Sequence, residues 1–209
     1  ASKFVADNTA VRGGIVRGGL LNNALWWFRW GAMLTFITGW LYIFYVAFHL
    51  FGGPREFATT AYGWKIFFGG MLGTTMWANV WFVIWPAQQV VMRSADQVAT
   101  GGQAIPEAAP RGARSGLASR TNTMLSIPML FFMGAAKHLQ MANPASGGQK
   151  WGALILLAVV IVIVEVNALV GQPAPPTGGK KILSTLNGTF WGGFIIAIVM
   201  YLILAKLFG

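Results

Sequence analysis

Five long runs of apolar residues, separated by segments rich in glycine, proline and charged residues, dominate the hydrophobic pattern of the chain. Each run is long enough for an α-helix to cross a hydrocarbon core of about 30 Å, which needs about 20 residues. We expect transmembrane helices at residues 27–51, 66–85, 121–139, 151–170 and 186–208. The third run is short and contains Pro128, which removes one backbone donor. The pattern therefore predicts an all-α integral membrane protein, a bundle of about five transmembrane helices.

Two segments outside these runs differ from them in composition. Residues 1–25 form a glycine-rich amino-terminal arm, in which Arg12 and Arg17 are followed by glycine and asparagine and not by the apolar core of a secretory signal. Residues 26–209 form the transmembrane domain. The longest connection within it, residues 88–120, contains two prolines and a Gly-Gly pair. We expect an inner loop there, whose first part continues as an amphipathic surface helix.

The placement of lysine and arginine predicts which way the chain crosses the membrane. With the amino terminus inside, ten of the 15 lysines and arginines lie in inner segments and five in outer segments. Cytoplasmic segments carry the excess of these residues, so the pattern favours an amino terminus inside and a carboxyl terminus outside (N-in/C-out). Tryptophans gather at the predicted span ends, where indoles sit at headgroup level: Trp26, Trp27, Trp30, Trp64, Trp85 and Trp151.

The composition supports the membrane class and removes several others. Charged residues make up 10% of the chain, against about 25% in soluble domains. The net charge of +10 comes from residues that flank the apolar runs, so we expect an anionic lipid surface, and not nucleic acid, as its partner. The absence of cysteine excludes an iron–sulfur cluster and a c-type haem. The sequence also has no phosphate-binding loop, metalloprotease motif or nucleophile elbow, which argues against an enzyme working alone.

The two histidines of the chain, His49 and His138, end the first and third predicted spans. Because odd-numbered spans run in the same direction, both imidazoles are expected near the outer face at similar depth. Two neutral imidazoles on facing helices are suitable axial ligands for a b-type haem, a cofactor that needs no cysteine. The alternative is a pair of interfacial residues, hydrogen-bonded to carbonyls, lipid or a partner. The sequence leaves both interpretations open.

Glu165 lies well inside the fourth predicted span, where an acidic side chain costs roughly 3 kcal/mol on insertion scales. It would serve there as a proton-relay group, as a hydrogen-bond partner in a quinone site, or as a charge paired with another subunit. The alternative is a hydrogen-bonded glutamate near the inner interface, supported by Asn167 two residues further on.

Small and polar residues inside the spans predict how the helices pack. Glycines recur at helical spacings that bring backbones close together: Gly31 and Gly39, Gly69 and Gly73, and Gly188 and Gly192. We favour packing within the chain over contact with another subunit for these glycines. Four polar residues are expected to hydrogen-bond across helices: Asn79, Asn122, Thr123 and Ser126.

Three stretches of the chain resemble a known family. They are residues 27–39 (WFRWGAMLTFITG), 70–89 (GMLGTTMWANVWFVIWPAQQ) and 120–133 (RTNTMLSIPMLFFM). Together they resemble the membrane domain of the bacterial urate hydroxylase/urate dehydrogenase family, often labelled urate oxidase N-terminal. The resemblance extends from residue 26 to about residue 170. It implies a multi-pass helical protein of the bacterial inner (cytoplasmic) membrane.

The chain departs from the pattern of that family at two places. Where the family reads Ser-Asn-His after the third stretch, this chain has Lys137 at the histidine position and His138 one residue later, about 100° further round a helix. Gly31 stands where the family commonly has an acid. Many members end in a c-type cytochrome that takes the electrons. The resemblance therefore implies the fold and the membrane location, and the catalytic activity is not carried over.

Three functions are open on this reasoning. The first is a non-catalytic accessory or scaffold subunit of a larger respiratory or photosynthetic electron-transport complex, whose partners are other membrane subunits and lipids. The second is an electron-transfer subunit, with haem b between His49 and His138 or a quinone near Glu165. The third is the membrane domain of a urate-oxidising dehydrogenase that passes electrons to a separate cytochrome. We favour the first, because the chain has few polar residues inside its spans.

Overall fold

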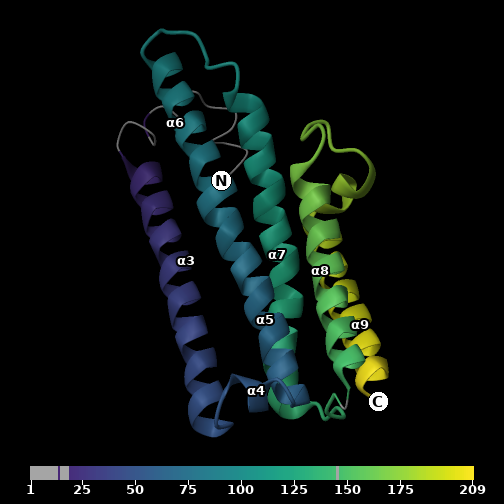
Figure 1. The fold of residues 1–209 in the computed structure, drawn as a ribbon. Coiled ribbons are helices and arrows are strands. Elements are labelled where there is room, and N and C mark those ends of the chain that lie inside the picture. Colours follow the sequence, from purple (N-terminus) through teal and green to yellow (C-terminus); the bar gives the residue numbers. More distant parts are fainter. Residues whose placement is uncertain (1–13, 15–18, 145) are drawn as a thin grey trace.

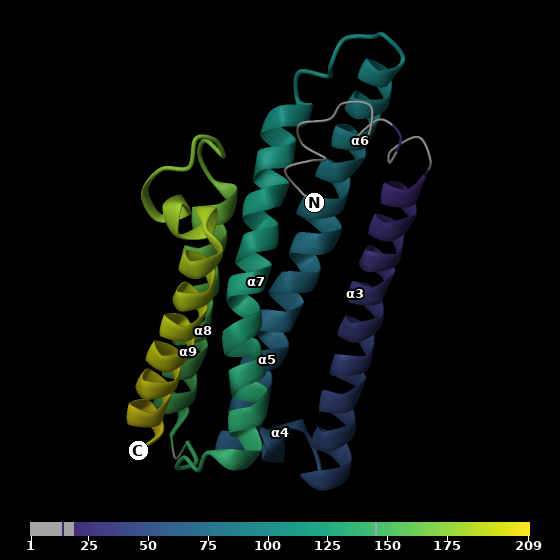
Figure 2. The same ribbon diagram turned by 180° about the vertical axis from the view of Figure 1, so that it is seen from behind.

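The chain folds into long helices joined by short connections, with no β-strand in the part that the structure describes (Figure 1). The computed structural model describes residues 14, 19–144 and 146–209. Its helical elements are, in chain order, α3 (Leu20–Tyr45), the π-helix η1 (Val46–Leu50), α4 (Pro54–Phe57), α5 (Ala61–Ala78), the π-helix η2 (Asn79–Ile84), α6 (Trp85–Ala99), α7 (Ala108–His138), α8 (Gly147–Leu169), the 3-10 helix η3 (Gly178–Ser184) and α9 (Leu186–Phe208). Helices α5, η2 and α6 form one continuous helical rod, and the successive rods of the bundle run in opposite directions (Figures 1 and 2).

Four helical stretches are long and apolar enough to cross a membrane: Leu20–Leu50, Ala61–Ala99, Gly147–Leu169 and Leu186–Phe208. The third predicted span lies within α7, which is long but less apolar, because its first half carries Arg111, Arg114 and Arg120. The all-helical class is therefore confirmed, and four apolar helices agree with a membrane protein. The fifth crossing and the orientation stay predictions.

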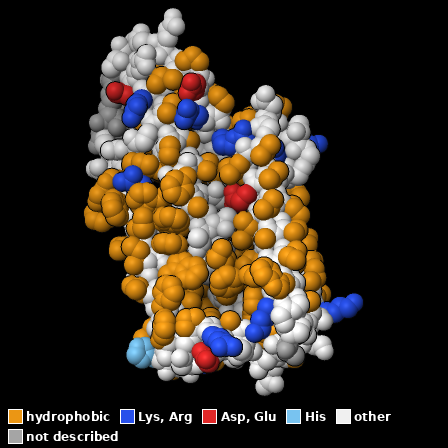
Figure 3. Space-filling model, viewed as in Figure 1, with side chains coloured by type: hydrophobic (Ala, Val, Ile, Leu, Met, Phe, Trp, Pro, Cys, Tyr) orange, Lys and Arg blue, Asp and Glu red, His pale blue; other side chains and the backbone are white. Residues whose placement is uncertain are grey.

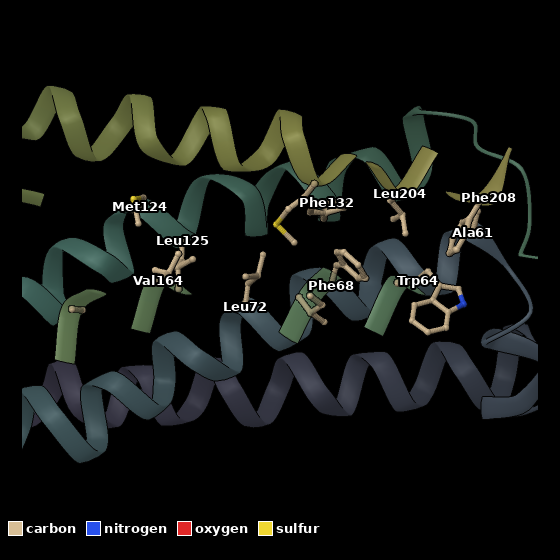
Figure 4. Packing of buried hydrophobic residues seen from close by; sticks show 14 of the residues in the cluster. Ala61, Trp64, Phe68, Leu72, Met124, Leu125, Phe132, Val164, Leu204 and Phe208 are labelled. Carbon is tan, nitrogen blue, oxygen red and sulfur yellow. The ribbon is translucent and has the colours of Figure 1, made fainter. Parts of the chain in front are cut away.

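Helix α7 lies at the centre of the bundle. Helices α5 and α6 pack along one side of it and α8 and α9 along another (Figures 1 and 2). Phe132 of α7 lies against Phe68 of α5, with ring centroids 5.2 Å apart, and both side chains are fully buried. Leu72 and Leu204 contribute to the same core from α5 and α9 (Figure 4). Neighbouring helices thus surround α7, and its Pro128 is buried among them, which protects the backbone carbonyl that proline leaves without a donor.

The connection between α6 and α7 is much shorter than the sequence predicted. The expected inner loop, residues 88–120, is mostly helical, and only residues 100–107 join the two helices. The reason is that polar residues of α6 find partners in the packed structure: Gln88 Nε2 donates to Ser115 Oγ of α7 (2.9 Å), and Ser94 Oγ accepts from the Ile105 backbone N–H (2.9 Å). Proline is tolerated in the first turn of α7, where no intrahelical donor is lost.

The predicted amino-terminal arm, residues 1–25, is also shorter at its end. Helix α3 begins at Leu20 and includes the last residues assigned to the arm. Residues 1–13 and 15–18 lie outside the described part of the chain.

Close helix packing at glycine confirms most of the predicted seams. A methyl group added at Gly69 would meet Met133 of α7 at 2.9 Å, and one added at Gly192 would meet Met124 at 2.9 Å. These glycines therefore serve contacts within the chain. Gly31 and Gly39 differ from the prediction, because no atom of another helix lies within 4 Å of a methyl group placed there.

The outer surface of the bundle is largely apolar. Figure 3 shows a broad hydrophobic band, with most of the charged side chains gathered at its two ends. Large exposed apolar residues on α3, α8 and α9 contribute to this surface: Leu34, Leu41, Ile155, Ile163, Ile195 and Leu202. We call the end that holds the start of α3, residues 100–107 and the end of α8 the α6–α7 end, and the opposite end the α4 end.

Candidate functional site

A hydrogen-bonded group of three polar side chains joins three helices inside the bundle. Asn79 Nδ2, at the start of η2, donates to Glu165 Oε1 of α8 (2.8 Å) and to Asn122 Oδ1 of α7 (3.0 Å). Asn122 Nδ2 in turn donates to the Met76 carbonyl oxygen (2.9 Å). We call Asn79, Asn122 and Glu165 the polar network. Two of its members were predicted to bond across helices, and Glu165 was singled out on its own; the structure brings the three together.

The local backbone explains why Asn79 can reach two partners. It begins the π-helix η2, in which the wider turn interrupts the regular helical ladder between α5 and α6. Asn79 is 3% exposed, so burying its amide N–H groups without an acceptor would destabilise the folded protein. The side chains of α7 and α8 supply those acceptors. The π-helix was not predicted, because no proline or glycine in residues 79–84 marks it.

The chemical character of the network is that of one carboxyl group held in a fixed position. Glu165 is half-buried, and its second oxygen, Oε2, has no hydrogen-bond partner among the described residues. The neighbouring side chains of α8 at Val162 and Val166 are exposed and apolar. No group of three or more His, Asp or Glu side chains suited to a metal ion occurs within the described residues. The network therefore presents an acceptor for one further donor or cation.

A groove of about 820 Å³ lies beside the network. Helix α3 forms one wall, and α5, η2 and α7 form the other. Asn122 belongs to both the groove and the network. The groove is lined by the two α3 glycines, Gly31 and Gly39, by hydroxyl side chains such as Thr35 and Ser126, and by aromatic rings. The sequence analysis did not predict this groove. It is open beside Gly31 and Gly39 because these glycines have no side chain and no atom lies within 4 Å of a Cβ placed on them.

The two histidines lie at the α4 end of the bundle, as the parallel course of α3 and α7 requires (Figure 1). Both side chains are exposed. The ring of His49 lies 4.7 Å from that of Tyr45, centroid to centroid, and neither histidine lines the groove. Exposed imidazoles fit an interfacial position more simply than a haem enclosed between helices. The haem b site stays a prediction, which a pyridine haemochrome assay of the purified protein tests.

Two basic side chains in the described structure have surroundings that the sequence did not reveal. Lys65 of α5 is 2% exposed, and its Nζ donates to the Leu139 carbonyl oxygen at the end of α7 (2.5 Å). Arg29 of α3 lies over the rings of Trp81 and Trp85, with its Cζ 4.6 Å and 4.3 Å from their centroids. The sequence shows that these two tryptophans are four residues apart and so share a helix face. It does not show that Arg29 contacts them, because that contact depends on the packing of α3 against η2 and α6.

In its described part, the chain is thus all-helical, with four helices apolar enough to cross a membrane and an internal polar network. The chain belongs to the urate oxidase N-terminal family, whose match covers residues 41–172. The resemblance seen in the sequence is thus confirmed. No curated protein and no solved structure matches the chain. The match includes the whole polar network but begins after Arg29 and Gly39, and it ends before α9.

Proposed function

We propose that this chain is a non-catalytic, multi-pass subunit of the bacterial inner membrane, packed as an accessory or scaffold component within a larger bioenergetic complex. Glu165 carries the proposal. A half-buried carboxyl group on an apolar helix, with one oxygen bound to Asn79 and the other without a partner in the described chain, is unfavourable against lipid. A donor or cation from another subunit would satisfy it, in an electron-transport complex of the respiratory or photosynthetic type.

The outer surface supports the same proposal. The exposed side chains around Glu165 on α8 are apolar, so a partner helix could pack there without leaving other polar groups unpaired. The alternating directions of α3, α5–α6, α7, α8 and α9 are those that five crossings need (Figure 1). In the proposed orientation, the α6–α7 end is inside and the α4 end is outside. Within this scheme the chain offers partners two flanks, α3 on one side and the α8–α9 pair on the other.

Extraction of native membranes in mild detergent, followed by native electrophoresis, tests the accessory role. We expect the wild-type chain to co-migrate with other subunits. Glu165→Gln keeps an oxygen to accept the bond from Asn79 but removes the charge, so association should weaken by about tenfold or more if a partner cation is lost. The matched control is Glu107→Gln, which removes an exposed carboxylate that pairs with Arg111, four residues further along the chain; it should co-migrate as the wild type does.

Two results would contradict the proposal. If the wild-type chain is a stable monomer without any partner after gentle extraction, it is not a subunit of a larger complex. A Glu165→Gln variant that stays in the complex as firmly as the wild type would show that the charge of Glu165 plays no part in it.

Family membership favours one second candidate, the membrane domain of a urate-oxidising dehydrogenase that passes electrons to a separate cytochrome. Its test is urate-dependent reduction of a cytochrome in native membranes. That activity should disappear when this chain is deleted and return when the chain is restored. Reduction at an unchanged rate in the deletion strain would exclude this role.

A further inference from the structure

We infer that the groove along α3 binds an anionic phospholipid, with the headgroup at Arg29 and an acyl chain lying along the groove toward the α4 end. The inference rests on three observations: an unpaired cation next to the lining residue Phe28, unpartnered donors on the helix that this cation contacts, and an open apolar channel of suitable length. It does not depend on the accessory role proposed above.

Arg29 is the cation beside one end of the groove: it follows the lining residue Phe28, and it contacts Trp85, which follows the lining residue Ile84. Its guanidinium lies over the indoles of Trp81 and Trp85, which face α3 from η2 and α6. Cation–π contacts of this kind hold the guanidinium in place but do not neutralise its charge. No ion pair or hydrogen bond of Arg29 occurs within the described residues, and its Nε is buried without a partner. A phosphate group supplies the negative charge and the acceptors that this guanidinium lacks.

Two more donors without partners lie on the η2–α6 helix that Arg29 contacts. Trp81 Nε1 and Gln89 Nε2 are buried and have no hydrogen-bond partner in the described structure. Trp81, Trp85 and Gln89 follow one another at intervals of four residues, so they share one face of the η2–α6 helix, the face that Arg29 contacts. Arg29, Trp81 and Gln89 thus each have a donor nitrogen without a partner, and no carboxylate of the described chain accepts from them. Such a set favours an oxygen-rich anion over a neutral ligand.

The groove provides the site for the acyl chain. It follows α3 from Phe28 to Ile43, a rise of about 22 Å along the helix. That length exceeds the depth of one leaflet, which is about 15 Å. Most of its hydroxyl groups already have acceptors: Thr35 Oγ1 donates to the Gly31 carbonyl oxygen (3.0 Å), and Ser126 Oγ donates to that of Thr123 (2.8 Å). An apolar chain can therefore enter without breaking a hydrogen bond.

The position of Arg29 suits a headgroup. Trp26 and Trp27, on the turn before it, are 41% and 68% exposed, as tryptophans at the membrane–water interface commonly are. Basic residues gather at the same α6–α7 end, among them Arg93, Arg111 and Arg114. An anionic lipid in that leaflet would be drawn to this end of the bundle and then held by Arg29.

Native mass spectrometry of the purified full-length chain tests the inference. The protein is incubated in detergent with equal amounts of phosphatidylglycerol and phosphatidylcholine that carry the same acyl chains. We expect the wild type to retain the anionic lipid about fivefold more than the zwitterionic one. Arg29→Gln should abolish that preference. Arg55→Gln, which removes an exposed arginine of α4 at the opposite end, should leave it unchanged.

A second pair of variants tests the acyl-chain channel. Gly39→Phe places a large side chain in the groove, and no atom lies within 4 Å of the Cβ that it adds. Gly134→Phe adds the same side chain at a position outside the groove where the Cβ is equally free of contacts. We expect Gly39→Phe to lose both lipids and Gly134→Phe to keep them, with similar unfolding temperatures for the two variants. Anionic lipid retained equally by Arg29→Gln or by Gly39→Phe would overturn the inference, as would a wild type that carries a neutral molecule such as a quinone, or no lipid.

Discussion

Asn79 is the residue on which the interior polar chemistry of this chain depends. Its single amide nitrogen serves acceptors on two other helices, Asn122 and Glu165. Because these acceptors lie in an apolar bundle, each would be left unsatisfied if the amide were removed. The same reasoning separates Asn79 from the hydroxyl residues of the spans. The Thr123 hydroxyl, for example, donates to the Ser119 carbonyl oxygen of its own helix.

Asn79→Leu should lower the free energy of unfolding by about 1–3 kcal/mol, because it orphans both acceptors. Unfolding in mixed micelles, followed by circular dichroism, measures the change. The double variant Asn79→Leu/Glu165→Leu should regain part of the loss, since the carboxyl that needed a donor is then gone. Thr123→Val is the control, with an expected change within about 0.5 kcal/mol. An Asn79→Leu protein as stable as the wild type would show that the network contributes no stability.

At the scale of whole helices, α7 and α9 approach closely because glycine permits it. A methyl group added at Gly193 of α9 would come within 2.6 Å of the Met124 carbonyl oxygen and 2.7 Å of the Ile127 side chain, both on α7. The obstacle at Met124 is backbone, so a rotamer change cannot relieve it and the two helices must separate. Where a glycine faces open space, as Gly39 does, the helices instead leave a channel.

We expect Gly193→Ala to destabilise the protein by about 1–3 kcal/mol, the usual cost of overpacking. Gly134→Ala is a matched control in α7, because no atom lies within 4 Å of its added methyl group. It should leave stability unchanged or raise it by up to about 1 kcal/mol, since alanine favours the helix. Detergent unfolding of the two variants side by side measures the difference. Equal stability of the two would mean that α9 does not depend on its contact with α7 at this point.

For the whole molecule, the arrangement of charge and helix direction sets the expected orientation. The connection between α6 and α7 and the connection before α5 lie at opposite ends of the bundle (Figures 1 and 2). The excess of lysine and arginine in the segments at the α6–α7 end predicts that this end faces the cytoplasm.

Single-cysteine variants test this orientation cleanly, because the native chain has no cysteine. Thr59→Cys and Thr100→Cys replace exposed residues at the α4 end and the α6–α7 end. In intact cells, a membrane-impermeant maleimide should label Thr59→Cys and Gly209→Cys, and should reach Thr100→Cys only after permeabilisation. The reverse labelling pattern would show that the chain has the opposite orientation, with the α4 end in the cytoplasm. If Thr59→Cys and Gly209→Cys are labelled from different sides of the membrane, the chain does not cross it an odd number of times.

The sequence alone determined the class of this protein, because a run of apolar residues is a local property that a helix in lipid must satisfy by itself. It placed the last helix at its observed bounds, Leu186–Phe208, and the glycines Gly69 and Gly192 at close contacts with α7. It also marked Glu165 as unusual, since a carboxyl in an apolar run is conspicuous without any knowledge of its neighbours.

Only the tertiary structure decided which residues act together. Asn79 and Glu165 are 86 positions apart in the chain, and Arg29 meets Trp85 only because α3 packs against α6. The length of α6 and α7 was likewise underestimated, because their polar faces are stabilised by each other and not by a local pattern. Hydrogen bonds and cation–π contacts need two partners at a fixed distance, and in this bundle the partners come from different helices. Their pairing is therefore set by packing and not by periodicity.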